Sequence, residues 1–422
     1  MKEQFLTAPN NDVINDHEIK DALKASLDSM GELKNVLIVP PDITRSHAYA
    51  GPITRMLWDL LPNTHIDIMP ALGTHMPMTK DEAEHMFPGL PFERFLKHDW
   101  RHDTIKIGEV PAEFVREVSE GRLNEPIEVE VNKLIVDNTY DLIISVGQVV
   151  PHEVVGMANY SKNILVGCGG DSLINKSHYL GSLYGMERMM GRHDTPVRRV
   201  FDYAEEHFLK DVPLLYVLTV TTTDTHNQVH VRSLSIGRQR ELFTRASEES
   251  VKHNLILVDE PFKKAVVYLD PDEFRTTWVA NKGIYRTRMA MADHGELIIL
   301  APGVEKFGED PRNDALIAEY GYYGYERVDQ LVQENEDLQQ NLGVAAHLIH
   351  GSSEGRFRIT YAPKHLTREQ VEAVGFHYMP YDNAVSQYDP AKLSDGYNTV
   401  DGEEVFYISN PALGLWAYRD AF

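Results

Sequence analysis

The stretch NVLIVPPDITR, residues 35–45, decides the fold because it joins a short apolar run directly to a polar turn. Apolar, β-branched runs of this length are typical of strands that are buried on both faces of a sheet. Similar runs occur at residues 65–72, 141–147, 214–220 and 254–259. Helical patterns separate them, among them residues 49–61 and residues 79–87, the latter opening with a threonine cap. This alternation predicts an α/β domain with a mainly parallel sheet.

A second set of strand and helix signals follows the first. Apolar runs recur at residues 265–270, 296–302 and 356–363, with a long polar helix expected around residues 325–350. We therefore predict two α/β domains, a larger N-terminal one over 1–265 and a smaller C-terminal one over 270–395. The apolar tail, residues 400–422, is expected to dock back on the first domain. The default place for an active site is then the cleft between the domains.

Composition limits the partners of the chain. With 422 residues it can bury more than one core. It has 41 basic against 64 acidic residues, a net charge of -23, which disfavours nucleic acid and anionic membrane surfaces as partners. The one cysteine, Cys168, allows no intrachain disulfide and no cysteine-based metal cluster. With no signal-peptide pattern and no long apolar run, we expect a cytoplasmic protein.

Polar residues follow three of the predicted strands. Asp42, Thr44 and Arg45 come after the first strand, His75 after the next, and His152 after the strand at 141–147. Loops at the carboxyl ends of parallel strands converge on one edge of the sheet, where α/β proteins bind ligands. We therefore expect these five side chains to lie in one cleft.

Each residue also has an ordinary explanation. A histidine after a strand is commonly a capping or surface residue, an Asp with a nearby Thr can form an Asx turn or helix cap, and an arginine can pair with a nearby acid. Lys162 could be a solvated loop lysine, and His178 could be a surface residue at the start of a helix over 177–186. The GCGG run, residues 167–170, lacks the dinucleotide spacing, and no Walker, GxSxG or HExxH motif is present.

The ordered set of motifs resembles the lactate racemase family. PDITR and GTHMP are followed by PHEVVGMANYSKNILVGCGGDSLINKSH, residues 151–178, in which a lysine lies ten residues after His152 and a histidine sixteen further on. The resemblance covers the first half motif by motif and the remainder by length and layout, as in a divergent member. The family uses a nickel-pincer nucleotide, a pyridinium-3-thioamide-5-thiocarboxylic acid mononucleotide that carries nickel.

The resemblance implies how that cofactor is held. Lys162 would be its covalent thioamide tether, and His178 would complete the nickel coordination begun by one carbon and two sulfurs of the cofactor. Soft sulfur with imidazole suits nickel. An acylated lysine carries no charge, so its burial costs less than that of an ammonium group.

The resemblance also implies a reaction at C2 of a 2-hydroxy acid. His75 and His152 would be general bases, one for each configuration, since imidazole titrates near neutral pH. One histidine takes the hydroxyl proton while hydride moves to the cofactor, which leaves a 2-oxo acid, and hydride then returns to the other face. Arg45 would bind the substrate carboxylate. Asp42 and Thr44 would hold the nucleotide or orient a base.

The sequence departs from the family pattern at two places. Asn159, Tyr160 and Ser161 stand where the family has a glycine pair and a basic residue, so Asn159 or Ser161 would serve the nucleotide phosphate. In the run IYRTRMA, residues 284–290, arginines replace an amide and a lysine.

Tyr285, Arg286 and Arg288 in that run would contact the substrate, unless they form a helix face with solvated arginines. They favour a larger polar acid, with an aldonic acid such as gluconate ahead of malate or lactate.

Two other functions remain open from the sequence. One is a nicotinamide-dependent 2-hydroxyacid dehydrogenase, although no dinucleotide fingerprint is present. The other is a non-catalytic binding protein of the same family. For the racemase or epimerase, the expected partners are the small-molecule substrate and, transiently, the enzymes that make the cofactor.

Overall fold

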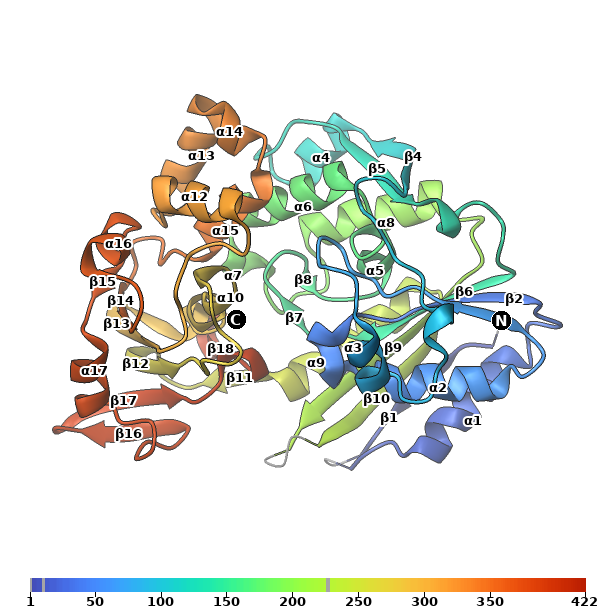
Figure 1. Cartoon of the computed structure of the whole chain (residues 1–422), viewed down its shortest axis with the longest axis horizontal. Coiled ribbons are helices and arrows are strands. Elements are labelled where there is room, and N and C mark those ends of the chain that lie inside the picture. Colours follow the sequence, from blue (N-terminus) through green and yellow to red (C-terminus); the bar gives the residue numbers. More distant parts are fainter. Residues whose placement is uncertain (1, 10–11, 225–227) are drawn as a thin grey trace. The chain divides into compact units, whose positions relative to one another are not determined.

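The computed structural model describes residues 2–9, 12–224 and 228–422 (Figure 1). The chain forms two compact units. The first comprises Met1–Leu180 and Met189–Asn254, and the second comprises Gly181–Arg188 and Leu255–Phe422. Each unit contains a six-stranded sheet with helices, so the predicted α/β class is confirmed.

The first unit is built on a mainly parallel sheet with the strand order β1-β10-β9-β6-β2-β3. Its strands are β1 (Gln4–Thr7), β2 (Asn35–Val39), β3 (His65–Ile68), β6 (Leu142–Gln148), β9 (Leu214–Thr223) and β10 (Val229–Gly237). The central strands β9, β6, β2 and β3 are parallel, whereas β10 and β1 add antiparallel pairs at one edge. The apolar runs predicted the parallel strands because these are buried on both faces.

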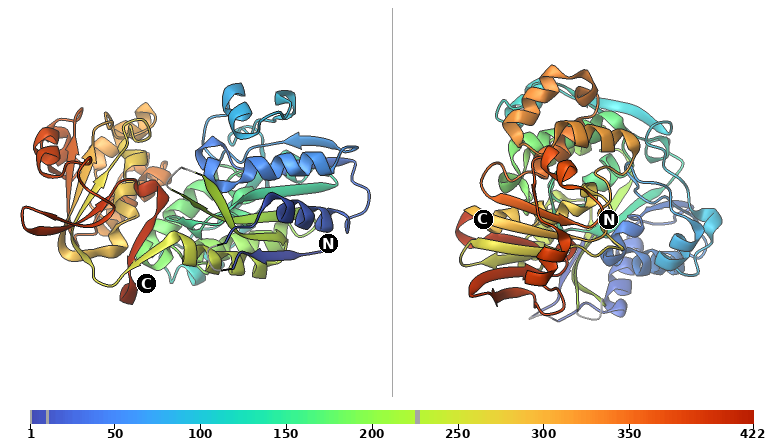
Figure 2. Two further views of the ribbon diagram at one scale, coloured as in Figure 1. Left: turned by 90° about the horizontal axis from the view of Figure 1, so that it is seen from below. Right: turned by 60° about the vertical axis from the view of Figure 1, so that its left-hand side comes forward.

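Helices cover both faces of this sheet (Figure 2). On one face α1 (Asp16–Leu27) and α2 (Ala50–Leu60) pack into a core with apolar residues of β2, β6 and β9. On the other face lie α5 (Ser161–Leu165) and α9 (Arg240–Asn254), where the ring of Tyr160 contacts the rings of Tyr216 and Phe243 at 4.4 and 5.3 Å. The remaining helices are α3 (Lys80–Met86), α4 (Ala112–Val118), α6 (Asp171–Tyr184), α7 (Met186–Met189) and α8 (Pro196–Phe208).

Two small hairpins complete the first unit. They pair β4 (Thr104–Val110) with β5 (Ile127–Asn132), and β7 (Pro151–His152) with β8 (Gly156–Met157). The threonine cap predicted for α3 is present, because the Thr79 side chain accepts a hydrogen bond from the Glu82 amide and the Glu82 carboxylate bonds back to the Thr79 amide.

The second unit has the strand order β15-β14-β13-β12-β17-β16, with parallel pairing except between β16 and β17. Its strands are β11 (Leu255–Val258), β12 (Phe262–Tyr268), β13 (Met291–Ala301), β14 (Arg358–Pro363), β15 (His377–Tyr378), β16 (Gly396–Val400), β17 (Glu403–Ile408) and β18 (Leu415–Tyr418). Its helices are α10 (Thr277–Ala280), α11 (Lys282–Tyr285), α12 (Pro311–Tyr320), α13 (Tyr325–Glu334), α14 (Glu336–Gln339), α15 (Leu342–His350), α16 (Arg368–Ala373) and α17 (Tyr381–Gln387).

Some elements differ from the prediction. The single long helix expected over 325–350 is divided into α13, α14 and α15, because Asn335 (φ -129°, ψ 115°) and Asn341 (φ -134°, ψ 55°) leave the helical region. In the tail, β18 pairs in parallel with β11, and both strands belong to the second unit. The first unit therefore ends at Asn254, and the tail belongs to the second unit instead of docking on the first.

No helix within the described ranges has both the length and the apolar character needed to span a bilayer.

Candidate active site

The predicted residues of the first unit gather where the strand order of its sheet reverses. β2 pairs with β3 on one side and with β6 on the other, and β6 in turn pairs with β9. The connections from these strands leave in opposite directions, which opens a crevice at their carboxyl ends. The loops after β2, β3 and β6 carry Asp42, His75 and His152, respectively.

Asp42 links the loops that follow β2 and β3. Its carboxylate is 5% exposed, and its Oδ2 lies 2.7 Å from Nδ1 of His75. The Thr44 hydroxyl donates a hydrogen bond to Oδ1 of the same carboxylate. Burial opposes ionisation of Asp42, but His75, Thr44 and the charge of Arg45 together hold its pKa below the ordinary value. Asp42 therefore contacts one of the predicted bases directly, and Thr44 contacts the same carboxylate.

His152 has a different environment. It lies in β7 and is 6% exposed, and its Nδ1 accepts a hydrogen bond of 3.1 Å from the backbone N–H of Val154. Burial sets its pKa well below the usual value, against the opposing charge of Glu153. The ring is therefore neutral near neutral pH.

Lys162 lies in α5, partly buried, with its amine among other cationic groups. Burial, reinforced by the positive charge of Arg45, lowers the pKa of the Lys162 amine to about 7. The carboxylates of Glu153 and Asp42 oppose this shift. A large fraction of the amine is therefore unprotonated and nucleophilic at neutral pH.

His178 lies in the middle of α6, not at a helix start as the sequence suggested, and it is only partly exposed. Its Nδ1 lies 2.6 Å from the carbonyl oxygen of Ile174, so Nδ1–H donates and the lone pair remains on Nε2. Burial, followed by the charge of Lys162, lowers the pKa of His178 to about 4. The ring is thus a neutral imidazole with Nε2 able to bind a metal, and a backbone contact sets its tautomer.

The electrostatic couplings place these groups in one neighbourhood. The charge of Lys162 acts on His152 and on His178, and the charge of Arg45 acts on Lys162 and His152. Asp42 joins the group through Lys162. The structure therefore brings together the residues that the sequence predicted for the N-terminal domain.

Asn159 and Ser161 take part in holding the loop before Lys162. Arg198, which the sequence analysis missed, donates to the carbonyl of Asn159 at 3.1 Å and to the hydroxyl of Ser161 at 2.9 Å. The side-chain oxygen of Asn159 accepts from the backbone of Tyr160 at 2.7 Å. A signal for Arg198 was present in the sequence, because this arginine lies on the apolar face of α8 beside Val197 and Phe201.

The GCGG run serves packing. A Cβ atom at Gly169 would lie 1.8 Å from the carbonyl oxygen of Leu165, and one at Gly170 would lie 2.6 Å from the Glu130 carboxylate. That carboxylate also accepts from the backbone of Ser172 in the first turn of α6 at 3.2 Å. The start of this helix already carries an acidic side chain, which disfavours a phosphate there.

The run that carries Tyr285, Arg286 and Arg288 lies in the second unit, in and just after α11. Arg288 is not a solvated arginine. It is 2% exposed, and it binds both carboxylate oxygens of Glu187, at 2.8 and 3.1 Å, and the carbonyl of Ser352. In contrast, the buried Nε of Arg286 makes no hydrogen bond. Tyr285 is buried.

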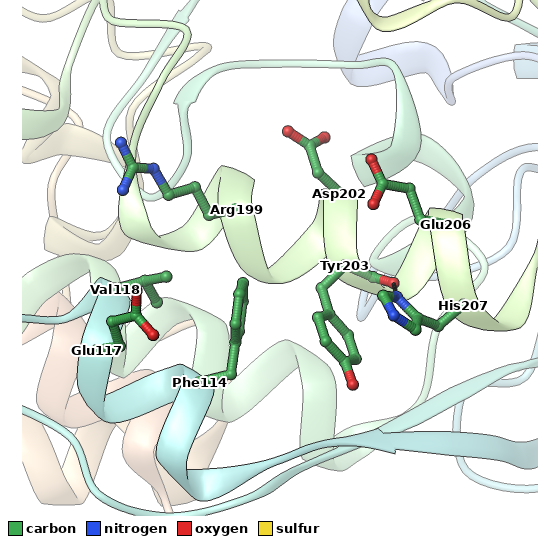
Figure 3. Close-up of a pocket in the computed structure, with 8 residues that line it drawn as sticks. All are labelled: Phe114, Glu117, Val118, Arg199, Asp202, Tyr203, Glu206 and His207. Atoms are coloured by element: carbon green, nitrogen blue, oxygen red, sulfur yellow. Dashed lines mark hydrogen bonds between the residues drawn. The ribbon is translucent and has the colours of Figure 1, made fainter.

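Two further features bear on the ligands. Among the described residues, no group of three or more His, Cys, Asp or Glu side chains is arranged to hold a metal ion. A groove of about 420 Å³ lies in the first unit between α4 and α8 (Figure 3). It is lined by Phe114, Glu117, Val118, Arg199, Asp202, Tyr203, Glu206 and His207. None of the predicted site residues lines it.

The lowered pKa of Lys162 predicts a pH-dependent cost to folding. The pKa of about 7 in the folded chain is below the ordinary lysine pKa of 10.5, so the cost to folding is full below pH 7 and disappears as the pH rises toward 10.5. We expect Lys162→Met to raise the free energy of unfolding relative to wild type by about 2 kcal/mol more at pH 6.5 than at pH 10. Urea denaturation at both pH values measures this difference.

The exposed Lys20 on α1 provides a matched control, since Lys20→Met changes the same side chain at the surface. A pH-independent difference between wild type and Lys162→Met would contradict the burial of this amine.

Comparison with known proteins gives one domain match and two similar solved structures. Residues 7–191 match the family model of the lactate racemase N-terminal domain. No match is found among curated proteins. A crystal structure of a Thermotoga maritima protein is similar over 98% of this chain and 100% of that one, with 25% identity and a TM-score of 0.80.

The lactate racemase apoprotein of Thermoanaerobacterium thermosaccharolyticum is similar over 94% of this chain and 92% of that one, with 16% identity and a TM-score of 0.67. That likeness concerns the fold. The domain match contains every predicted site residue of the first unit, and it identifies residues 7–191 as similar to the lactate racemase N-terminal domain.

Proposed function

We propose that this protein is a racemase or epimerase that inverts C2 of a 2-hydroxy acid with a nickel-pincer nucleotide held by Lys162 and His178. The match of residues 7–191 to the lactate racemase N-terminal domain supports a racemase- or epimerase-type function in general. The observation that carries the specific proposal is the environment of Lys162. Its amine has a pKa of about 7 and couples electrostatically to His152 and His178 at the switch point of the sheet.

The residues present fit such a cofactor. An unprotonated amine can be acylated, and the acylated lysine carries no charge in its partly buried position. His178 has its Nε2 lone pair available because Nδ1 is bonded to Ile174. When bound, the nucleotide supplies a centre that accepts hydride and returns it.

The other side chains bind the substrate and move its proton. Arg45 offers a guanidinium fork for the carboxylate. Because His75 Nδ1 faces the ionised carboxylate of Asp42, the neutral ring has its lone pair on Nε2 and can take the hydroxyl proton, and Asp42 then stabilises the imidazolium ion. His152 accepts from Val154 at Nδ1, so its neutral ring offers an Nε2–H donor. The two histidines thus begin a turnover in different states.

Two alternatives make different demands on the chain. A nicotinamide-dependent dehydrogenase needs a dinucleotide site, whereas the glycine-rich run before α6 is packed against Glu130. A non-catalytic binding protein has no need for an amine whose pKa is lowered in this way. Neither accounts for Lys162 as well as a covalent tether does.

Intact-mass spectrometry tests the proposal directly. We expect the chain produced together with the cofactor-making enzymes and nickel to gain the mass of the nickel-bearing nucleotide on the peptide that contains Lys162. Lys162→Arg should remain unmodified, because it has no acylatable amine there. Lys176→Arg, in the same segment, should be modified like wild type. An unmodified wild-type chain under these conditions would favour a binding protein.

The substrate is the second part of the proposal. The buried Arg286 Nε has no hydrogen-bond partner, which favours a substrate with polar groups beyond C2. We expect loaded protein to epimerise gluconate faster than malate and lactate, as followed by optical rotation. Arg286→Met should lower the rate of gluconate epimerisation by about tenfold more than the rate of lactate racemisation. Lactate as the fastest substrate would contradict this part alone.

The pairing of Asp42 with His75 predicts unequal effects of two neighbouring substitutions. Asp42→Asn removes the acceptor that orients His75 and stabilises its cation, so kcat should fall by about 100-fold. Thr44→Val removes a hydroxyl but leaves the carboxylate, so kcat should fall by less than about tenfold. Steady-state rates of loaded variants measure both. Equal losses would show that Asp42 does not act through His75.

A further inference from the structure

Arg198 is a buried cation whose guanidinium group donates three hydrogen bonds to one loop. The residue lies in α8 and is 0% exposed. Its Nη1 donates to the Ser161 hydroxyl at 2.9 Å, and its Nη2 donates to the carbonyls of Met157 at 2.8 Å and Asn159 at 3.1 Å. Removing a guanidinium group from water costs free energy, so its presence at this buried position calls for an explanation.

The loop that Arg198 holds has a strained backbone. Asn159 has a φ of 68° and Tyr160 a φ of 57°, in the left-handed region that side chains other than glycine rarely adopt. Such backbone conformations are strained and persist only where their surroundings enforce them. The loop also packs directly on Gly147 of β6. A Cβ atom at Gly147 would lie 2.0 Å from the side-chain amide nitrogen of Asn159.

This loop determines where Lys162 lies. Tyr160 is the N-cap residue of α5, and α5 spans only Ser161–Leu165. So short a helix has little stability of its own, and its position depends on the contacts of the preceding loop. The guanidinium group of Arg198 also lies 4.3 Å from the ring centroid of Phe243, so a residue of α9 helps to hold the guanidinium group in place.

Arg198 also contributes to the charge around the Lys162 amine. Its positive charge acts on Lys162 in the same sense as that of Arg45, while Glu153 and Asp42 act in the opposite sense. His152 and His178 are also titratable neighbours, and the charge of Lys162 lowers the pKa of both.

We propose that Arg198 is the positioning residue for Lys162: by clamping the 157–161 loop from α8, it holds the lysine side chain in the buried place where the cofactor is attached. Attachment of a cofactor at Lys162 rests on the proposed function, whereas the clamp itself rests on the three hydrogen bonds of Arg198. Arg198 does not itself contact the reacting atoms and is therefore not a catalytic residue.

Three variants separate the clamp from the charge. Arg198→Lys keeps a cation but lacks the planar guanidinium group that donates to three acceptors. Arg198→Met removes both the cation and its donors. Arg199→Met is the matched control, since Arg199 is the next residue of α8, its side chain is 55% exposed, and it pairs with Asp194.

The first measurement uses the chain without cofactor. Pulse labelling with acetic anhydride across pH, followed by mass analysis of the Lys162 peptide, gives the pH midpoint of labelling, which we expect near 7 in wild type. Both Arg198 variants should raise this midpoint by about one pH unit or more, because a loosened loop lets water reach the amine. Arg199→Met should leave it unchanged.

The second measurement is the fraction of chain that carries the cofactor after production with the cofactor-making enzymes. We expect this fraction to fall at least tenfold in Arg198→Lys and to stay unchanged in Arg199→Met. If wild type carries no adduct, the proposed function fails, while the labelling midpoints still decide the role of Arg198. A folded Arg198→Lys with the wild-type midpoint would overturn the clamp, and if Arg198→Met does not fold, Arg198→Lys alone decides.

Discussion

The parallel pairing of β2 with β6 is the constraint on which the candidate site depends. It reverses the strand order at the centre of the first sheet and so leaves a crevice at the carboxyl ends of both strands. Charged groups in that crevice lose hydration. This desolvation is the main cause of the lowered pKa values of Lys162, His152 and His178. A chain with a net charge of -23 thus keeps a local cluster of bases that are largely neutral.

Much of the fold could be predicted because buried parallel strands leave a strong local signal. The run at residues 35–39 became β2, and the capping threonine at 79 began α3. The boundary near 265 was wrong because it depends on pairing between distant segments, β11 with β18, which no local pattern reveals. The break-up of the helix over 325–350 rests on backbone angles at two asparagines, and helix patterns do not specify these.

The site was predictable where its residues follow strands and unpredictable where they act from a distance. Asp42, His75 and His152 follow strands whose ends the sequence marks. That Asp42 contacts His75 could not be read from a separation of 33 residues. Arg198 was missed because an arginine on an amphipathic helix is ordinarily exposed. Its place on the apolar face of α8 indicated burial, but its carbonyl partners in the 157–161 loop are visible only in the fold.

The helix α6 belongs to both compact units, since it starts in the first at Asp171 and ends in the second at Tyr184. The chain returns to the first unit at Met189 and leaves it again after Asn254. No single cut in the polypeptide therefore separates the two units. A fragment that ends at Asn254 would contain Glu187 but lack Arg288, its ion-pair partner. A single crossover between the genes of two relatives therefore cannot exchange either unit whole, because the helix that carries His178 contributes residues to both units.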